Sequence, residues 1–186
     1  MGDADVQRAL RKLARLLDEI GVPYAIVDGM AMNEYGYQRV TTSVDILLTR
    51  EGLEKLKAHA LGHDYVEKFP DSRGLWDTEH GVSIDVILAG EYPGDGRPKP
   101  IQFPDPARVA VRGAHVALVS LPILIELKLA SGMSAPHRLR DLADVLDLIR
   151  SARLPIALAD ELDASVRNEY RELWQAAQTE DIESCP

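Results

Sequence analysis

Residues 26–48, IVDGMAMNEYGYQRVTTSVDILL, contain two apolar segments separated by a glycine turn and a polar stretch. The first segment ends at Asp28 and Gly29, and the second opens with Ser43 and Asp45. Because side chains alternate between the two faces of a strand, Ser43 and Asp45 share one face, and the apolar residues between and after them face a core. An acid at the start of a strand, beside a glycine turn that precedes a helix, can bind a metal ion that carries a phosphate group.

The order of these elements resembles the start of the nucleotidyltransferase fold of the DNA polymerase beta-like superfamily. In that family a strand ends in Gly-Gly or Gly-Ser, a helix follows, and a later strand carries Asp-x-Asp. Here the turn is Asp28-Gly29 and the acidic pair is Ser43-x-Asp45, so both half-motifs differ at their first position. The resemblance covers about residues 5–150. It implies an α/β (α+β) fold, with a mixed sheet flanked by helices and a C-terminal helical bundle.

Composition favours an ordinary globular protein. The 186 residues are 46% hydrophobic and 27% charged, and no apolar run reaches the ~18 residues of a membrane span. The net charge of −9 argues against a protein whose whole surface binds nucleic acid. The first ten residues lack the basic-then-apolar pattern of an export signal, and the single cysteine, Cys185, suits a reducing compartment. These features predict a cytoplasmic protein.

Hydrophobic spacing and turn residues predict the order of the elements. We expect an α/β core over residues 1–120 and a helical region over 121–186 packed on it. Residues 90–106 hold five of the 11 prolines and read as a long loop. Expected helices cover 4–20, 29–35, 50–61, 121–131, 136–150 and 156–177, and expected strands cover 24–27, 44–48, 64–69, 75–78, 82–88 and 115–119.

A second acid of interest, Asp85, lies in the middle of the apolar strand expected at 82–88. A carboxylate there is costly to bury unless it is paired or metal-bound. The superfamily resemblance implies that Asp45 and Asp85 hold Mg²⁺, which would bind the phosphates of a nucleoside triphosphate. The alternative is that these acids cap turns or pair with arginines such as Arg39 or Arg73.

The helical end carries further charged residues. Lys128 lies in the apolar segment LPILIELKLA, where it is either a functional residue or a surface lysine with a buried stem. Asp141 and Asp144 share a helix face, and their alternative role is an ion-pair row with Arg138 and Arg140.

Residues 121–130 and the segment RLRDLAD at 138–144 together resemble C-terminal motifs of the abortive-infection-type nucleotidyltransferase toxins, which have a Lys in a Leu/Ala helix and then an Arg-x-Lys-Asp-x-x-Asp-like helix. Some branches of that family also carry Ser or Thr for the first acid of the pair. The resemblance implies a site whose catalytic residues are Asp45, Asp85, Lys128 and Asp144. The implied nucleotide-binding residues are Gly29, Arg39, Ser43, Lys128 and Asp141.

Two hypotheses follow. In the first, the protein transfers a nucleoside monophosphate from a nucleoside triphosphate to a hydroxyl of a tRNA, a protein or a small molecule. One form of this hypothesis is that the protein is the toxin of a toxin–antitoxin pair. In the second, Asp28 and Ser43 mark a degenerate transferase scaffold that serves as a binding or regulatory partner. The residues available for a basic, tRNA-binding patch are Arg97, Lys99, Arg108 and Arg112.

Overall fold

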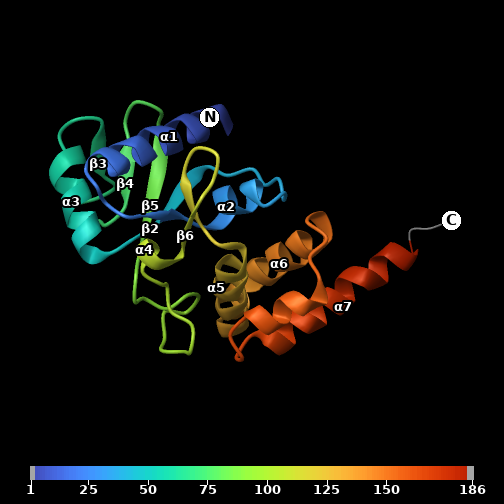
Figure 1. Ribbon diagram of the computed structural model, residues 1–186. Helices are drawn as coiled ribbons and strands as arrows, with labels where there is room; N and C mark the ends of the chain where they lie inside the picture. Colours follow the sequence, from blue (N-terminus) through green and yellow to red (C-terminus); the bar gives the residue numbers. More distant parts are fainter. Residues whose placement is uncertain (1–2, 184–186) are drawn as a thin grey trace.

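The computed structural model describes residues 3–183 and contains a seven-stranded mixed sheet in the order β3-β4-β5-β2-β1-β7-β6. Helices flank the sheet, so the predicted fold class is confirmed (Figure 1). The strands are β1 Ala25–Ile26, β2 Ser43–Leu48, β3 Tyr65–Glu67, β4 Leu75–Asp77, β5 Val82–Leu88, β6 Ala110–Arg112 and β7 Ala117–Val119.

The centre of the sheet pairs two strands that are far apart in the sequence. β2 and β5 run parallel, with Ser43 opposite Ser83 and Asp45 opposite Asp85. β1 is antiparallel to β2 and parallel to β7. Parallel pairing in register places equivalent side chains on the same face, so the two predicted acids are neighbours.

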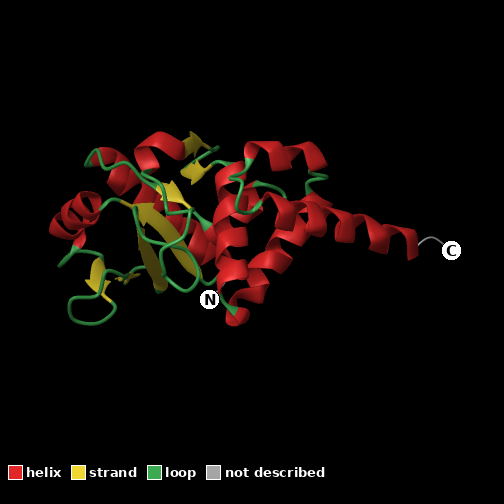
Figure 2. Ribbon diagram, turned by 90° about the horizontal axis from the view of Figure 1, so that it is seen from below, coloured by secondary structure: helices red, strands yellow, loops and turns green. Residues whose placement is uncertain are grey.

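Helices cover the sheet, and a group of helices packs beside it on one side. The helices are α1 Asp3–Glu19, α2 Asp28–Glu34, α3 Arg50–Ala60, α4 Pro106–Val109, α5 Leu121–Ser134, η1 Pro136–Arg138, α6 Leu139–Ser151, η2 Ile156–Glu161 and α7 Arg167–Glu183, η marking 3₁₀-helices. Figure 2 shows α5, α6 and α7 gathered at one side of the sheet, with α7 reaching away from the body of the molecule.

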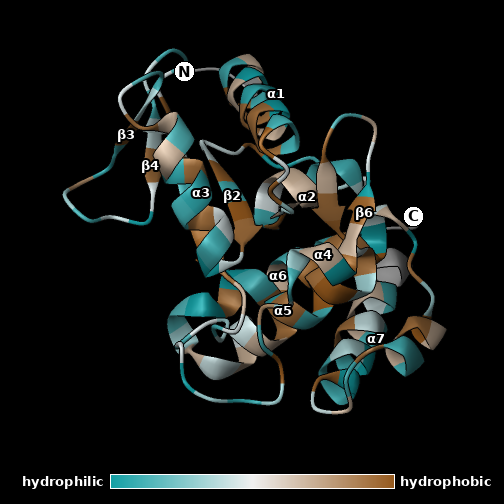
Figure 3. Ribbon diagram, turned by 60° about the vertical axis from the view of Figure 1, so that its left-hand side comes forward, coloured by the Kyte–Doolittle hydropathy of each residue, from teal (hydrophilic) through white to brown (hydrophobic). Residues whose placement is uncertain are grey.

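The core lies under α1 and along the strands. Leu13 and Leu17 of α1 are fully buried, as are Ile46 and Ile84 of the two central strands. In Figure 3 the central strands and much of α5 are hydrophobic, whereas the outer surfaces of α1 and α3 are largely hydrophilic. Burial of one apolar stripe per helix explains why these segments fold as amphipathic helices.

The sequence prediction was wrong about the last helix. Instead of one helix over 156–177, a 3₁₀-helix ends at Glu161 and α7 begins at Arg167. The Asp163 carboxylate accepts hydrogen bonds from the backbone N–H and hydroxyl of Ser165, and the Asp163 N–H donates to Glu126. An Asp that bonds the backbone two residues later stabilises a turn, so the helix is interrupted there.

Two short elements, α4 and β6, were also not expected. Asp105 caps α4 by accepting from the N–H of Ala107, and Pro106 occupies the first helical position. Both are ordinary helix-start signals, although four residues are too few to show a hydrophobic period.

Candidate active site

Two carboxylates lie side by side on adjacent strands. Asp45 and Asp85 are register partners, and both are partly buried. Asp85 forms an ion pair with Lys68 and accepts a hydrogen bond from the Ser83 hydroxyl at 3.4 Å. The carboxylate of Asp45 has no hydrogen bond or ion pair with any residue of the described range 3–183.

The environment of Asp45 disfavours its charge. Burial, the Asp28 carboxylate and the Asp85 carboxylate together raise the pKa of Asp45 to about 7. An unpartnered carboxylate beside a second one is the donor set that Mg²⁺ takes in proteins. Asp45 and Asp85 could ligate a divalent cation at this position if Lys68 released Asp85. Within residues 3–183, the sets of possible metal ligands whose atoms already lie within 4.8 Å of one another are Asp28, Asp141 and Asp144, and Asp77, Glu79 and His80.

The alternative of an ion pair holds for Asp85, although its partner is Lys68 and not an arginine. Arg39 contacts Asp28 and Asp144, and Arg73 contacts Glu91, so neither pairs with Asp45.

Lys128 lies at the centre of a cluster of carboxylates. Its ammonium is 2.6 Å from Asp28, 2.8 Å from Asp144 and 3.3 Å from Asp141, and its side chain is only 5% exposed. Burial lowers the pKa of Lys128, but the three carboxylates outweigh burial and the net shift is upward. Lys128 is therefore charged, and its interpretation as a surface lysine was wrong because α5 is covered by α6.

Asp28 directs its side chain to these cations. Its backbone φ is +53°, in the left-handed region that few residues other than glycine adopt. One carboxylate oxygen, Oδ1, contacts both the ammonium of Lys128 at 2.6 Å and Nη1 of Arg39 at 3.5 Å. Burial acts to raise the pKa of Asp28, but these cations lower it overall, so Asp28 is ionised.

Gly29 follows Asp28 for a packing reason. A Cβ atom added there would lie 2.2 Å from Cγ2 of Thr41, on the loop that leads to β2. The glycine thus lets the loop close over the start of α2, and a role in phosphate approach stays a prediction.

Arg39 is fixed in place by Asn33. The Asn33 side chain accepts from the Arg39 backbone N–H at 2.7 Å and donates to the Arg39 carbonyl at 3.1 Å. Nη1 of Arg39 donates to Asp144 at 2.7 Å, whereas its Nε is buried without a hydrogen-bond partner in the described chain.

The ends of α5 and α6 complete the cluster. Asp141 accepts from the Ser131 hydroxyl at 2.6 Å and pairs with Nε of Arg138 at 2.9 Å. The expected Arg138–Asp141 contact is thus present. Asp144 instead pairs with Lys128 and Arg39, while its other expected partner, Arg140, is exposed.

Three residues of the site were missed by the sequence reasoning. Lys68, which contacts Asp85, follows an edge strand and carries no local signal. Ser131 reaches Asp141 only because the two helices approach closely at Gly132, where a Cβ would lie 2.5 Å from Leu142. Tyr37 donates to Asp147 at 2.7 Å, across 110 residues of sequence.

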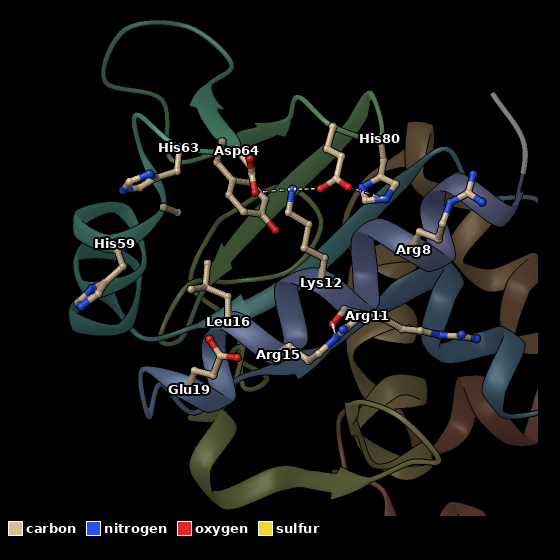
Figure 4. A pocket seen from close by; sticks show the side chains of 13 residues that line it. Arg8, Arg11, Lys12, Arg15, Leu16, Glu19, His59, His63, Asp64 and His80 are labelled. Atoms are coloured by element: carbon tan, nitrogen blue, oxygen red, sulfur yellow. Dashed lines mark hydrogen bonds and ion pairs between the residues drawn. The ribbon is translucent and has the colours of Figure 1, made fainter.

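A groove of about 620 Å³ lies away from the Lys128 cluster, between α1 and the segment from α3 to the β4–β5 turn (Figure 4). Its cationic lining residues are Arg8, Arg11, Lys12 and Arg15, and its acidic ones are Glu19, Asp64 and Glu79. The fully buried Asp77 lies beneath them, bound to Lys12 at 3.0 Å. The charges therefore balance, which does not favour a phosphate-backbone surface.

Comparison with known proteins places the fold in one class. No model of a known protein family matches the chain, and no curated protein does. An antigenic nucleotidyltransferase-like protein from Paracoccidioides brasiliensis matches 99% of this chain and 93% of its own, with a TM-score of 0.58 and 15% identity. ANT(2'')-Ia in complex with adenylyl-2''-tobramycin matches 92% of this chain and 98% of its own, with a TM-score of 0.51 and 14% identity.

These likenesses show that the chain has the fold of the nucleotidyltransferases. The fold expected from residues 26–48 is therefore confirmed, while membership of the superfamily and the abortive-infection relationship stay predictions. Within residues 3–183, none of the helices combines the length and the apolar character needed to span a membrane.

Proposed function

We propose that the protein is a Mg²⁺-dependent nucleotidyltransferase that moves a nucleoside monophosphate from a nucleoside triphosphate to an acceptor hydroxyl. One observation carries the proposal. Asp45 is a partly buried carboxylate without a partner in the described chain, next to Asp85 in register and within the electrostatic reach of Lys128. A folded protein keeps such a group at a cost, and a bound cation removes that cost.

In this proposal the residues have distinct roles. Asp45 and Asp85 hold the cation, and the hydroxyl of Ser43 stands where the superfamily has a third carboxylate. Lys128 and Arg39 bind phosphate oxygens, and Asp144 and Asp141 hold those two cations in position. When bound, Mg²⁺ supplies charge neutralisation at the transferred phosphate and the leaving pyrophosphate.

The acceptor follows from the likenesses rather than from the site. ANT(2'')-Ia was solved with adenylyl-2''-tobramycin, which suggests a small-molecule hydroxyl. The resemblance of residues 138–144 to abortive-infection toxins suggests a tRNA or protein acceptor, with an antitoxin as partner. We propose the acceptor search in the order tRNA, protein and small molecule.

A second candidate function is a binding or regulatory protein on the same scaffold. Two features favour it. The Asp28 carboxylate forms an ion pair with Lys128, and Ser43 stands where the superfamily has an acid. This candidate predicts that no nucleoside triphosphate binds in the presence of Mg²⁺. It also predicts a gain of such binding in the double variant Asp28→Gly and Ser43→Asp.

Calorimetric titration of the full chain with each of the four nucleoside triphosphates, in Mg²⁺ and in EDTA, separates the two candidates. The transferase predicts Mg²⁺-dependent binding that Asp45→Ala weakens by about 100-fold or more. The matched control is Asp71→Asn, which removes an exposed acid outside the site and leaves binding unchanged. Binding that survives in Asp45→Ala would refute the assigned cation site, and no binding by the folded wild-type protein would favour the second candidate.

A further inference from the structure

The cluster around Lys128 has as many acids as bases. Its cations are Lys128, Arg39 and Arg138, and its anions are the carboxylates of Asp28, Asp141 and Asp144. A triphosphate that entered this cluster would add several negative charges without a free cation to receive them. One of the three carboxylates therefore has to leave before a phosphate can be held here.

Only one of these carboxylates is placed to move. The side chains of Asp141 and Asp144 are 9% and 4% exposed, and both are fixed within α6 between two or more hydrogen-bonding partners. The side chain of Asp28 is 36% exposed and lies at the first residue of α2, where the chain leaves the sheet. If the Asp28 side chain rotates toward solvent, its ion pairs with Lys128 and Arg39 break, while helices α2 and α6 stay folded.

The position held by Asp28 has the properties of a phosphate-oxygen site. Lys128 and Arg39 converge on a single oxygen, Oδ1, as cations do on an oxygen of a phosphate. The Nε of Arg39 is buried without a hydrogen-bond partner in the described chain, so this guanidinium is not fully paired by protein groups. Lys128 itself is 5% exposed, so its ammonium binds an anion in a poorly solvated place.

We propose that the Asp28 carboxylate is an internal competitor for phosphate, which occupies the phosphate position on Lys128 and Arg39 until a polyphosphate displaces it. The proposal rests on the proposed function, because it concerns the triphosphate position of the same site. It explains why an acid stands where the superfamily has glycine: the side chain keeps the cations paired in the empty protein, and only a ligand with several phosphate charges displaces it.

The test uses inorganic tripolyphosphate in EDTA, which removes both the metal and the nucleobase from the measurement. We expect Asp28→Asn and Asp28→Gly to bind tripolyphosphate about ten-fold more tightly than the wild type, or better, by calorimetry at low ionic strength. Adding Lys128→Met to Asp28→Asn should remove that gain. Equal or weaker binding by both Asp28 variants would overturn the proposal, as would a gain that persists without Lys128.

A matched control separates the local effect from backbone and net-charge effects. Asp71 is an exposed aspartate with a φ of +62°, so Asp71→Gly also removes one negative charge and one left-handed non-glycine residue. It should bind tripolyphosphate as the wild type does. Since glycine adopts a φ of +53° freely, Asp28→Gly should remain folded, and circular dichroism would verify this for every variant.

Titration with Mg²⁺ and each nucleoside triphosphate then separates this inference from the proposed function. If wild type binds a triphosphate with Mg²⁺ but neither Asp28 variant binds tripolyphosphate more tightly, the competitor is refuted and the transferase stands. If the Asp28 variants bind tripolyphosphate more tightly but no variant binds a triphosphate with Mg²⁺, the competitor stands and the transferase is refuted.

Discussion

Within residues 3–183, two lysines on different parts of the fold each lie in contact with three carboxylates. Lys12 of α1 is 2.7 Å from Glu79, 3.0 Å from Asp77 and 3.2 Å from Asp64. Lys128 of α5 has an equally close set in Asp28, Asp144 and Asp141. In both clusters, a single ammonium lies within 3.3 Å of three carboxylates.

Their surroundings differ in ways that bear on function. The Lys12 cluster is open on one side to the groove of Figure 4, where the side chains of Asp64 and Glu79 are 61% and 57% exposed. On its other side the fully buried Asp77 bonds His80 at 2.8 Å, so the cluster ties α1 to the β4–β5 turn.

The Lys128 cluster adds Arg39, with its unpartnered Nε, and lies within the electrostatic reach of the lone Asp45 carboxylate. The Lys12 cluster also has a buried atom without a hydrogen-bond partner in the described chain, the hydroxyl of Tyr65, whose ring lies 4.9 Å from the Lys12 ammonium. What sets the Lys128 cluster apart is therefore the neighbouring pair of strand carboxylates, Asp45 and Asp85.

Replacing each lysine with methionine tests whether the two clusters differ in function. Either change leaves three carboxylates without their common cation, so we expect each to lower the free energy of unfolding by about 3–5 kcal/mol. Only Lys128→Met should also abolish Mg²⁺-dependent triphosphate binding. Denaturant unfolding and calorimetry of both variants check this, and loss of binding in folded Lys12→Met would contradict the assignment of the two clusters.

The next largest effect is expected at Asp45, and its sign depends on pH. The pKa of Asp45 is about 7 in the folded protein and near 4 in the unfolded chain. Since the folded state holds the proton more tightly, the wild type loses stability as pH rises from about 4 to about 7. Asp45→Asn lacks this loss, so we expect its stability relative to wild type to rise by up to about 4 kcal/mol between pH 4 and pH 8 without Mg²⁺.

Denaturant unfolding of wild type and Asp45→Asn between pH 4 and 8, in EDTA, measures this difference. Adding Mg²⁺ should stabilise only the wild type, because a ligand that binds the folded state raises its stability. A constant difference across this pH range would show that Asp45 is not the group that titrates.

Asp77 in the Lys12 cluster should show the opposite pH dependence. Burial acts to raise the pKa of Asp77, but the hydrogen bonds from His80 and Lys12 outweigh it and lower the pKa. Its contribution is therefore present above about pH 4 and is lost as pH falls through the folded-state pKa. We expect Asp77→Asn to cost about 2 kcal/mol at neutral pH and less in acid, as measured by thermal unfolding at each pH. A cost that grows in acid would contradict the ion-pair role.

The smallest effect is expected at Gly29. A methyl group at Gly29 would overlap Cγ2 of Thr41, so Gly29→Ala should lower the free energy of unfolding by about 1–2 kcal/mol. Thr41→Ser removes that methyl and should restore most of the loss in the double variant. A failure of this rescue, measured by thermal unfolding, would show that Gly29 is needed for something other than packing against the loop.

Much of the fold could be predicted from the sequence because its signals are local. The apolar stripe of residues 4–20, the glycine turn at Asp28-Gly29 and the strand patterns around Asp45 and Asp85 each depend on neighbours within a few residues. The chain-order resemblance then predicted a mixed sheet flanked by helices, which the structure confirms, whereas the register that pairs Asp45 with Asp85 came from the structure. The helix predicted over 156–177 failed because Asp163 makes a turn that interrupts the hydrophobic pattern.

The pairing of the charged side chains depends on tertiary packing and could not be predicted from the sequence. From the sequence, Lys128 could equally well be a surface lysine. No local pattern around Asp28 or Arg39 predicts that Asp28 contacts Lys128 of α5 or that Arg39 contacts Asp144 of α6, each about 100 residues away. Ion pairs of this kind arise from the packing of α2, α5 and α6 and have no local period or spacing. The sequence by itself determined the acids and the strands that carry them, whereas the packing decided which acids are neutralised and left Asp45 without a partner in the described chain.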